Sequence, residues 1–192
     1  KGLAKKGADI IFGTLFESGK ETPKWIGEFE NAKYFCLFAR SKKDFPMAVL
    51  KLAKILRAEK VDVLQTHLYE ASFVAFLAAK LARVPLKILT RHHLDQAHLI
   101  GKKLPIAVDR WEAKTADKVV TLGNAVREFL ISADGIDAEK IEVIHQGFDF
   151  EVFSADESDR KRIREEFNLS ENDFVIATIG NFFPTKGHRF LV

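Results

Sequence analysis

The chain has 192 residues, of which 47% are hydrophobic and 30% charged, a composition typical of a globular protein with a buried core. No apolar run approaches the roughly 18 residues that a membrane span needs. The single cysteine, Cys36, excludes an internal disulfide and fits a reducing, cytoplasmic setting. The net charge of +3 is a mild excess, and no nucleic-acid partner is expected.

Basic residues gather in short clusters along the chain. Each cluster by itself is typical of a solvated helix face. Their sum leaves open an attraction to an anionic membrane surface or to a phosphorylated substrate. The clusters lie at residues 1–6, 42–43, 51–60, 83–91 and 102–103.

Strand-like and helix-like segments alternate along most of the sequence. Short apolar runs rich in β-branched residues predict strands at 8–16, 34–38, 61–65, 86–89, 118–122 and 141–144. The segments between them have helical periodicity. This alternation predicts an α/β fold, a doubly wound parallel sheet with crossover helices.

Four helices are predicted between the strands. Asp44 is expected to cap the first, with Pro46 in its first turn and Val49, Leu52, Ala53 and Leu56 on its buried stripe. The second spans residues 70–83 and is rich enough in Ala, Phe and Leu to be deeply buried. The third buries Leu104, Val108, Trp111 and Thr115, and Asn124 caps the fourth, whose inner face is Val126, Phe129, Leu130 and Ala133.

Two segments depart from this rhythm. Residues 17–33 form a long polar connection, interpreted as a loop beside a site. Residues 156–166 are dense in charge and predict an exposed helix, so we place a domain boundary near residue 153. Beyond it, residues 174–179 predict a new buried strand.

The last strand is followed by a loop suited to a phosphate. Gly180 lets the backbone approach closely, and a helix expected to open at Lys186–Gly187 would present free N–H groups beside a mobile positive charge. A Walker loop is excluded, because the second glycine before the lysine and the Ser or Thr after it are absent.

Polar residues also follow the other strands, at the edge where open α/β sheets bind ligands. His67 follows the third strand, residues 90–93 the fourth, residues 123–124 the fifth and residues 146–149 the sixth. His67, His92 and His93 therefore fall at one edge, which indicates a site. A zinc site is not expected, because adjacent histidines on a strand point to opposite faces and no Cys or carboxylate pattern completes a tetrahedron. The GxGxxG fingerprint of NAD binding is absent as well.

Five short motifs in one order and spacing carry a resemblance. They are Asp62-Val-Leu-Gln-Thr-His67, Thr90-Arg-His92, the Glu112 to Val120 segment, Gly147-Phe-Asp149, and the Gly180 to Gly187 loop. Together they resemble the GT-B-fold glycosyltransferases of family 4, often called glycosyl transferase group 1. The resemblance implies an acceptor-side Rossmann-like domain at residues 1–152, whose first strand would precede Lys1. Residues 153–192 would be a linker and the truncated start of the donor-binding domain.

The resemblance further implies transfer of a sugar from a nucleotide-sugar donor, with retention and without a metal or other cofactor. The acceptor would be a sugar, a lipid-linked sugar or a polysaccharide of cell-envelope biosynthesis, met in the cytoplasm or at the inner face of the membrane. The 192-residue chain alone would be inactive. The implied site residues are catalytic His92 and Lys186; donor-binding Gly180, Asn181, Lys186 and Gly187; acceptor-side His67, Glu70 and His93; and hinge Gly147 and Asp149.

The sequence departs from the family pattern in three places. Gly123 replaces a usual serine, Gln146 the usual hinge asparagine and Asn181 a common arginine, which removes one charge expected at the diphosphate. Two alternatives stay open: a GT-B sugar-nucleotide epimerase, and a non-catalytic α/β binding domain.

Overall fold

The computed structural model describes residues 6–16, 26–27, 29, 32–92, 103–148, 156–182 and 186–191. The chain divides into two compact units, Lys1–Gln146 and Gly147–Val192. The domain boundary expected near residue 153 lies among residues 149–155, outside the described residues.

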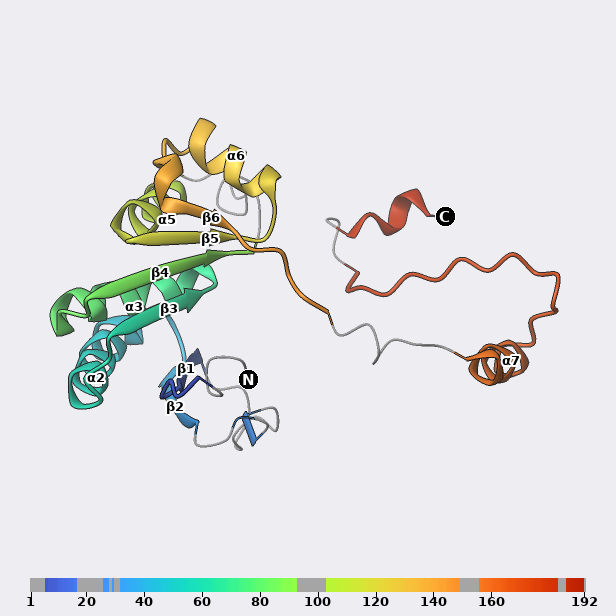
Figure 1. The fold of residues 1–192 in the computed structure, drawn as a ribbon, viewed down its shortest axis with the longest axis horizontal. Helices are drawn as coiled ribbons and strands as arrows, with labels where there is room; N and C mark the ends of the chain where they lie inside the picture. Colours follow the sequence, from blue (N-terminus) through green and yellow to red (C-terminus); the bar gives the residue numbers. More distant parts are fainter. Residues whose placement is uncertain are drawn as a thin grey trace. The chain divides into compact units, whose positions relative to one another are not determined.

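The first unit alternates strands and helices, as expected (Figure 1). Every strand pair is parallel, because a helix or a long connection separates consecutive strands. The elements are β1 (Ile11–Phe16), β2 (Lys33–Ala39), α2 (Phe45–Ala58), β3 (Val63–His67), α3 (Tyr69–Ala82), β4 (Leu86–Arg91), α5 (Lys103–Thr115), β5 (Lys118–Thr121), α6 (Asn124–Ser132) and β6 (Ile141–Val143), with single 3-10 turns η2 at Lys42–Asp44 and η3 at Ala138–Lys140. The predicted α/β fold with parallel strands is confirmed.

The strands form two sheets rather than one. A two-stranded sheet has the order β1–β2 and a four-stranded sheet the order β3–β4–β5–β6. Packing connects them, because Leu15 of β1 and Leu37 of β2 share a core with α2 and α3. The strand expected before Lys1 stays a prediction.

Helix α2 has the predicted apolar stripe and a different cap. Val49, Leu52, Ala53 and Leu56 are all buried, and a proline stands in the first turn. Asp44 occupies the N-cap position, but its carboxylate accepts no bond from that helix. It accepts instead from the backbone N–H groups of Arg40 and Ser41, at 2.9 and 3.0 Å, and so closes the preceding turn η2.

Helix α3 is deeply buried, as its composition predicts. Phe76, Ala78 and Ala79 have no exposed surface. The helix ends where Arg83 adopts a left-handed conformation with φ of 59°. Phe76 joins Leu89 of β4, Val119 of β5 and Leu130 of α6 in the core of the four-stranded sheet.

The predictions for the next two helices need correction. The buried residues of α5 are Asp109, Glu112 and Ala113. Of the face predicted to be buried, Trp111 packs against the core, whereas Leu104 is 74% exposed. The buried side of α5 therefore carries the polar side chains Asp109 and Glu112, which the apolar pattern did not predict. Asn124 is the first residue of α6 rather than its cap; Gly123 holds the cap position in an extended conformation.

The second unit has little regular structure among its described residues. Helix α7 (Glu157–Glu166) is exposed as predicted, and the Asp156 carboxylate caps it by accepting from the Asp159 N–H at 2.8 Å. The strand predicted at 174–179 is wrong: the segment makes no strand pairing among the described residues, and Ile179 is fully exposed. A strand needs a neighbour to satisfy its backbone.

The helix expected from Lys186 is a single 3-10 turn, η6 (His188–Phe190), within the described residues. Across the described part of the chain, no helix is both long and apolar enough to cross a membrane.

Candidate active site

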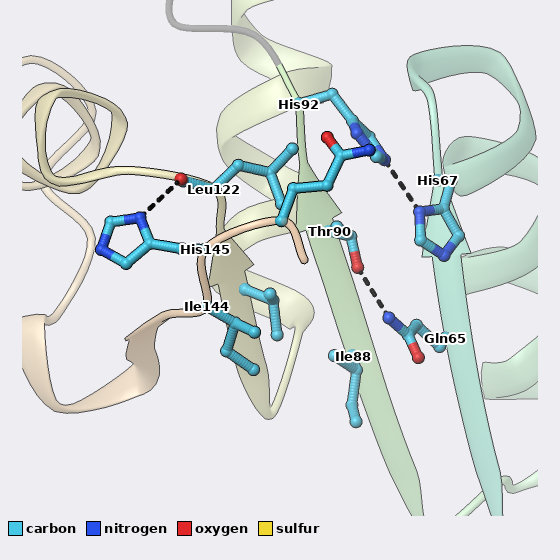
Figure 2. A pocket seen from close by; sticks show the side chains of 10 residues that line it. Gln65, His67, Ile88, Thr90, His92, Leu122, Ile144 and His145 are labelled. Carbon is cyan, nitrogen blue, oxygen red and sulfur yellow. Dashed lines mark hydrogen bonds between the residues drawn. The ribbon is translucent and has the colours of Figure 1, made fainter. Parts of the chain in front are cut away.

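The carboxyl ends of β3 to β6 form one side of a pocket of about 430 Å³ (Figure 2). Parallel pairing places His67 level with Thr90, so His92 lies just beyond the strand end on the same face. The lining residues are Gln65, His67, Ile88, Thr90, His92, Val120, Leu122, Ile144, His145 and Gln146, hereafter the histidine pocket. Most stand at alternate positions, because side chains of a strand point to opposite faces in turn.

His67 and His92 meet directly in this pocket, as their strand positions predicted. Nδ1 of His67 lies 2.8 Å from Nε2 of His92, so one ring donates a hydrogen bond to the other (Figure 2). The ring centroids are 5.1 Å apart with planes inclined at 40°. Although His67 keeps part of its surface exposed, burial of its ring and the nearby His92 lower its pKa. The neutral imidazole of His67 is therefore favoured at neutral pH.

A third histidine of the pocket, His145, was not among the predicted site residues. Its Nδ1–H donates to the backbone carbonyl of Leu122 at 3.3 Å, which leaves Nε2 as the acceptor of the neutral ring (Figure 2). A signal for it was present in the sequence. His145 lies two residues beyond the end of β6, at the edge where His67 and His92 also lie, whereas the residues predicted to follow that strand were 146–149.

The histidine pocket combines an aliphatic base with uncharged polar groups. Ile88, Val120 and Leu122 are apolar, and Gln65 donates to the hydroxyl of Thr90 at 3.0 Å. No Asp, Glu, Lys or Arg is among the lining residues. Among the described residues, no cluster of three His, Cys, Asp or Glu side chains is arranged for a metal ion. Such a surface suits a polyhydroxylated ligand, which offers both hydroxyl groups and apolar C–H faces.

Arg91, which lies between the pocket residues Thr90 and His92, points to the opposite face of the sheet. There its guanidinium forms an ion pair with Asp109 of α5 and donates to the Asp109 carbonyl at 3.1 Å. Glu112, one turn further along α5, is fully buried, and neither of its carboxylate oxygens has a hydrogen-bond partner among the described residues. Burial raises the pKa of Glu112 to about 8, against the opposing effect of Arg91.

The other predicted acceptor-side residues do not line the pocket. Glu70 lies in the first turn of α3 and pairs with Lys42, Nζ to Oε1, at 3.0 Å. His93 lies outside the described residues, as does most of the loop at 17–33.

The predicted donor-binding residues come together within the second unit. A Cβ added to Gly180 would lie 3.6 Å from Cγ of Lys186 and 3.7 Å from Nε2 of His188, so the glycine backbone packs against both side chains. His188 donates from Nε2 to the carbonyl of Asn181 at 3.0 Å and closes the loop. Gly187 has φ of 70°, a conformation that favours glycine. Lys186 is exposed, and no ion pair involves it among the described residues.

The predicted hinge falls at the junction of the two units. Gly147 is the first residue of the second unit, is exposed, and does not have a positive φ. A Cβ added there would meet no atom of the described residues within 4 Å. Asp149 lies outside the described residues.

Known proteins resemble the chain in sequence and in fold. A curated relative, the UDP-Gal:alpha-D-GlcNAc-diphosphoundecaprenol alpha-1,3-galactosyltransferase of Escherichia coli, is 30% identical over 144 residues, or 72% of this chain and 37% of the relative. Anabaena Alr3699/HepE, solved in complex with UDP-glucose, has a TM-score of 0.66 and 17% identity, and the match covers 85% of this chain and 51% of that one. The UDP-N-acetylglucosamine 2-epimerase of Rickettsia bellii has a TM-score of 0.54 and 15% identity, over 85% and 52% of the two chains.

The solved structures establish the fold alone, at these levels of identity. The chain spans little more than a third of the E. coli relative and about half of the two solved chains. The sequence model of Glycosyltransferase Family 4, in contrast, matches residues 1–152 as one continuous segment. That segment holds the whole histidine pocket. The chain therefore belongs to Glycosyltransferase Family 4.

Proposed function

We propose that the full-length protein transfers a sugar from a nucleotide-sugar donor to an acceptor. The observation that carries the proposal is the histidine pocket at the carboxyl ends of β3 to β6, in a chain of Glycosyltransferase Family 4. Open parallel sheets bind ligands at this edge. The printed names of the E. coli relative and of the Anabaena complex, which include UDP-Gal and UDP-glucose, support a nucleotide-sugar donor.

The first unit would bind sugar hydroxyl groups in the histidine pocket. His92 is proposed to contact the donor sugar as a hydrogen-bonding group, and Glu70 and His93 to serve the acceptor side, the role that the resemblance also implies for His67. The lack of charged residues among the lining side chains suits an uncharged sugar ring. The acceptor class, lipid-linked sugar or polysaccharide, is proposed from the name of the E. coli relative, whose acceptor is a diphosphoundecaprenol-linked sugar.

The second unit would bind the donor diphosphate. Gly180 presents its backbone close to Lys186, whose charge is exposed, and the carbonyl of the neighbouring Asn181 accepts a hydrogen bond from His188. A positive charge held near the leaving diphosphate stabilises the negative charge that develops as the sugar departs. We propose that transfer retains the anomeric configuration and needs no metal ion, and that these 192 residues alone do not catalyse transfer.

A peripheral contact with an anionic membrane is proposed as well. Helix α2 exposes Met47 and Leu50, each more than half exposed, beside Lys51 and Lys54 on the same helix face. Apolar and basic side chains on one exposed face are typical of helices that bind at a membrane surface. The protein should sediment with phosphatidylglycerol vesicles and not with phosphatidylcholine vesicles; equal recovery with both would contradict the proposal.

The test of the catalytic proposal uses the full-length protein with a panel of UDP- and GDP-sugars and undecaprenyl-linked acceptors. Lys186→Ala should lower transfer about 100-fold or more, because it removes an oriented charge from the leaving group. Lys161→Ala, which removes an exposed lysine of α7, is the matched control and should leave transfer unchanged. If the Lys186 variant stays within about twofold of wild type, Lys186 has no role in the reaction.

The same assays separate the remaining alternatives. NMR of the first-formed product decides retention from the coupling of its anomeric proton, and activity in EDTA decides the need for a metal. Conversion of the sugar nucleotide without any acceptor would identify an epimerase, the alternative to which the Rickettsia bellii structure draws attention. Binding of nucleotide sugars without any turnover would identify a binding domain.

A further inference from the structure

The contact between His67 and His92 joins two neighbouring strands at the pocket. Two residues earlier on each strand, a second hydrogen bond joins side chains of the same two strands. Gln65 of β3 donates it to the hydroxyl of Thr90 of β4 at 3.0 Å. The two contacts stand on one face, since each pair is displaced by two residues from the other. Together they form a short ladder of polar side chains that leads into the histidine pocket (Figure 2).

The chemistry of two imidazoles limits what this contact allows. At 2.8 Å one of the two nitrogens must carry a proton and the other must offer a lone pair. The contact uses Nε2 of His92, so only Nδ1 of that ring is left for a ligand. If His67 donates, Nδ1 of His92 carries the proton and donates; if His67 accepts, Nδ1 of His92 is an acceptor.

We propose that His67 is a positioning residue for His92. Nδ1 of His67 holds the His92 ring in place and fixes which nitrogen of the His92 ring carries the proton toward the substrate. This rests on the proposed function of His92 as the group that contacts the donor sugar. It gives His67 a role different from the acceptor contact implied by the family resemblance. Partners that orient metal-binding histidines change affinity or activity by about 10- to 100-fold when they are removed, and we expect an effect of the same order here.

The test exploits the fact that the contact uses one particular nitrogen of His67. Asparagine places its amide near the position of Nδ1, glutamine places it near Nε2, and alanine removes both. His67→Asn should therefore keep His92 in a single tautomer, whereas His67→Gln and His67→Ala should release it. The readout is the two-bond ¹H–¹⁵N correlation spectrum of the histidine rings in the 192-residue chain at pH 8, about 1.5 units above the ordinary histidine pKa.

His145→Ala is the matched control, because it removes another histidine of the pocket, whose ring bonds to Leu122 and not to His92. It should leave the His92 signals in place. A mixture of tautomers for His92 in the wild type, or the same His92 pattern in all three His67 variants, would overturn the proposal. Circular dichroism identifies any variant that does not fold. If His67→Ala does not fold, the comparison of His67→Asn with His67→Gln decides alone.

Kinetics of the full-length protein give a second readout. His67→Ala should lower kcat about 10- to 100-fold with the acceptor KM unchanged, and His67→Asn should recover most of the loss. A raised acceptor KM with an unchanged kcat would show that His67 binds the acceptor, and the positioning role would be wrong. If the wild type transfers no sugar, the proposed function fails, while the spectra still decide the His67–His92 contact.

Discussion

The buried carboxyl group of Glu112 should make the stability of the chain depend steeply on pH. The side chain has no exposed surface, and both of its oxygens lack a hydrogen-bond partner in the part of the chain that the structure describes. Burial penalises the charged form and, with Asp109 adding to the effect, raises the pKa to about 8, although Arg91 acts in the opposite direction. The perturbation is Glu112→Gln, which keeps the shape of the side chain and removes its titration.

The sign follows from the two pKa values, about 8 in the folded chain and 4.5 in the unfolded chain. The folded state binds the proton more tightly, so the stabilisation is fully present below pH 4.5 and is lost as pH rises to about 8. Each pH unit in this window costs about 1.4 kcal/mol of unfolding free energy. From pH 5.5 to 7.5 the wild type should therefore lose roughly 3 kcal/mol more than Glu112→Gln.

Urea denaturation followed by circular dichroism at pH 5.5, 6.5 and 7.5 measures this difference. Glu128→Gln, at an exposed glutamate of α6, is the control and should follow the wild type at every pH. The quantity compared is the change of the unfolding free energy with pH. The cost of burying an amide in place of a carboxyl group does not depend on pH, so it cancels. If the curves of Glu112→Gln and wild type run parallel, the carboxyl group is not held neutral in the folded chain, and the reasoning fails.

Two glycines provide the remaining predictions. In β1, Gly13→Ala should lower the unfolding free energy by about 1–3 kcal/mol in urea titration, because the added Cβ would overlap the Phe35 ring; a change under about 0.5 kcal/mol would mean that this ring moves freely. Gly147→Val, whose added Cβ meets no atom within 4 Å, is the matched control and should leave the melting temperature nearly unchanged. In the full-length protein the same valine should slow turnover if residue 147 is a hinge, and normal turnover would contradict that role.

The fold of the first unit could be predicted where local pattern and burial agree. The predicted strands of this unit from residue 61 onward are present in the structure. The apolar stripe predicted for α2 and the deep burial predicted for α3 are also observed. The α5 prediction was right for Trp111, which packs against the core, and missed the buried Asp109, because the contact of Asp109 with Arg91 is non-local and periodicity carries no information about it. The strand predicted at 174–179 failed because a strand exists only with a partner, which residue type does not supply.

The candidate site was predictable to the level of the sheet edge. Parallel strands bring their carboxyl ends together, so His67 and His92 were expected to be neighbours. Their hydrogen bond depends on strand register and on ring rotation, which the sequence does not contain. For β6, residues 146–149 were predicted to follow the strand, so His145 was passed over, although it lies two residues after the last residue of the strand, Val143.

The separation of the strands into two sheets has a consequence for local opening of the chain. The β1–β2 sheet has only two strands, and its core residues Leu15 and Leu37 pack against α2 and α3. Sheets this small have little stability of their own. Amide hydrogens of β1 and β2 should therefore exchange with deuterium through a partial unfolding that leaves α3 and the central strand β4 intact. The first unit would then consist of two cooperative folding units, with the histidine pocket on the one that opens last.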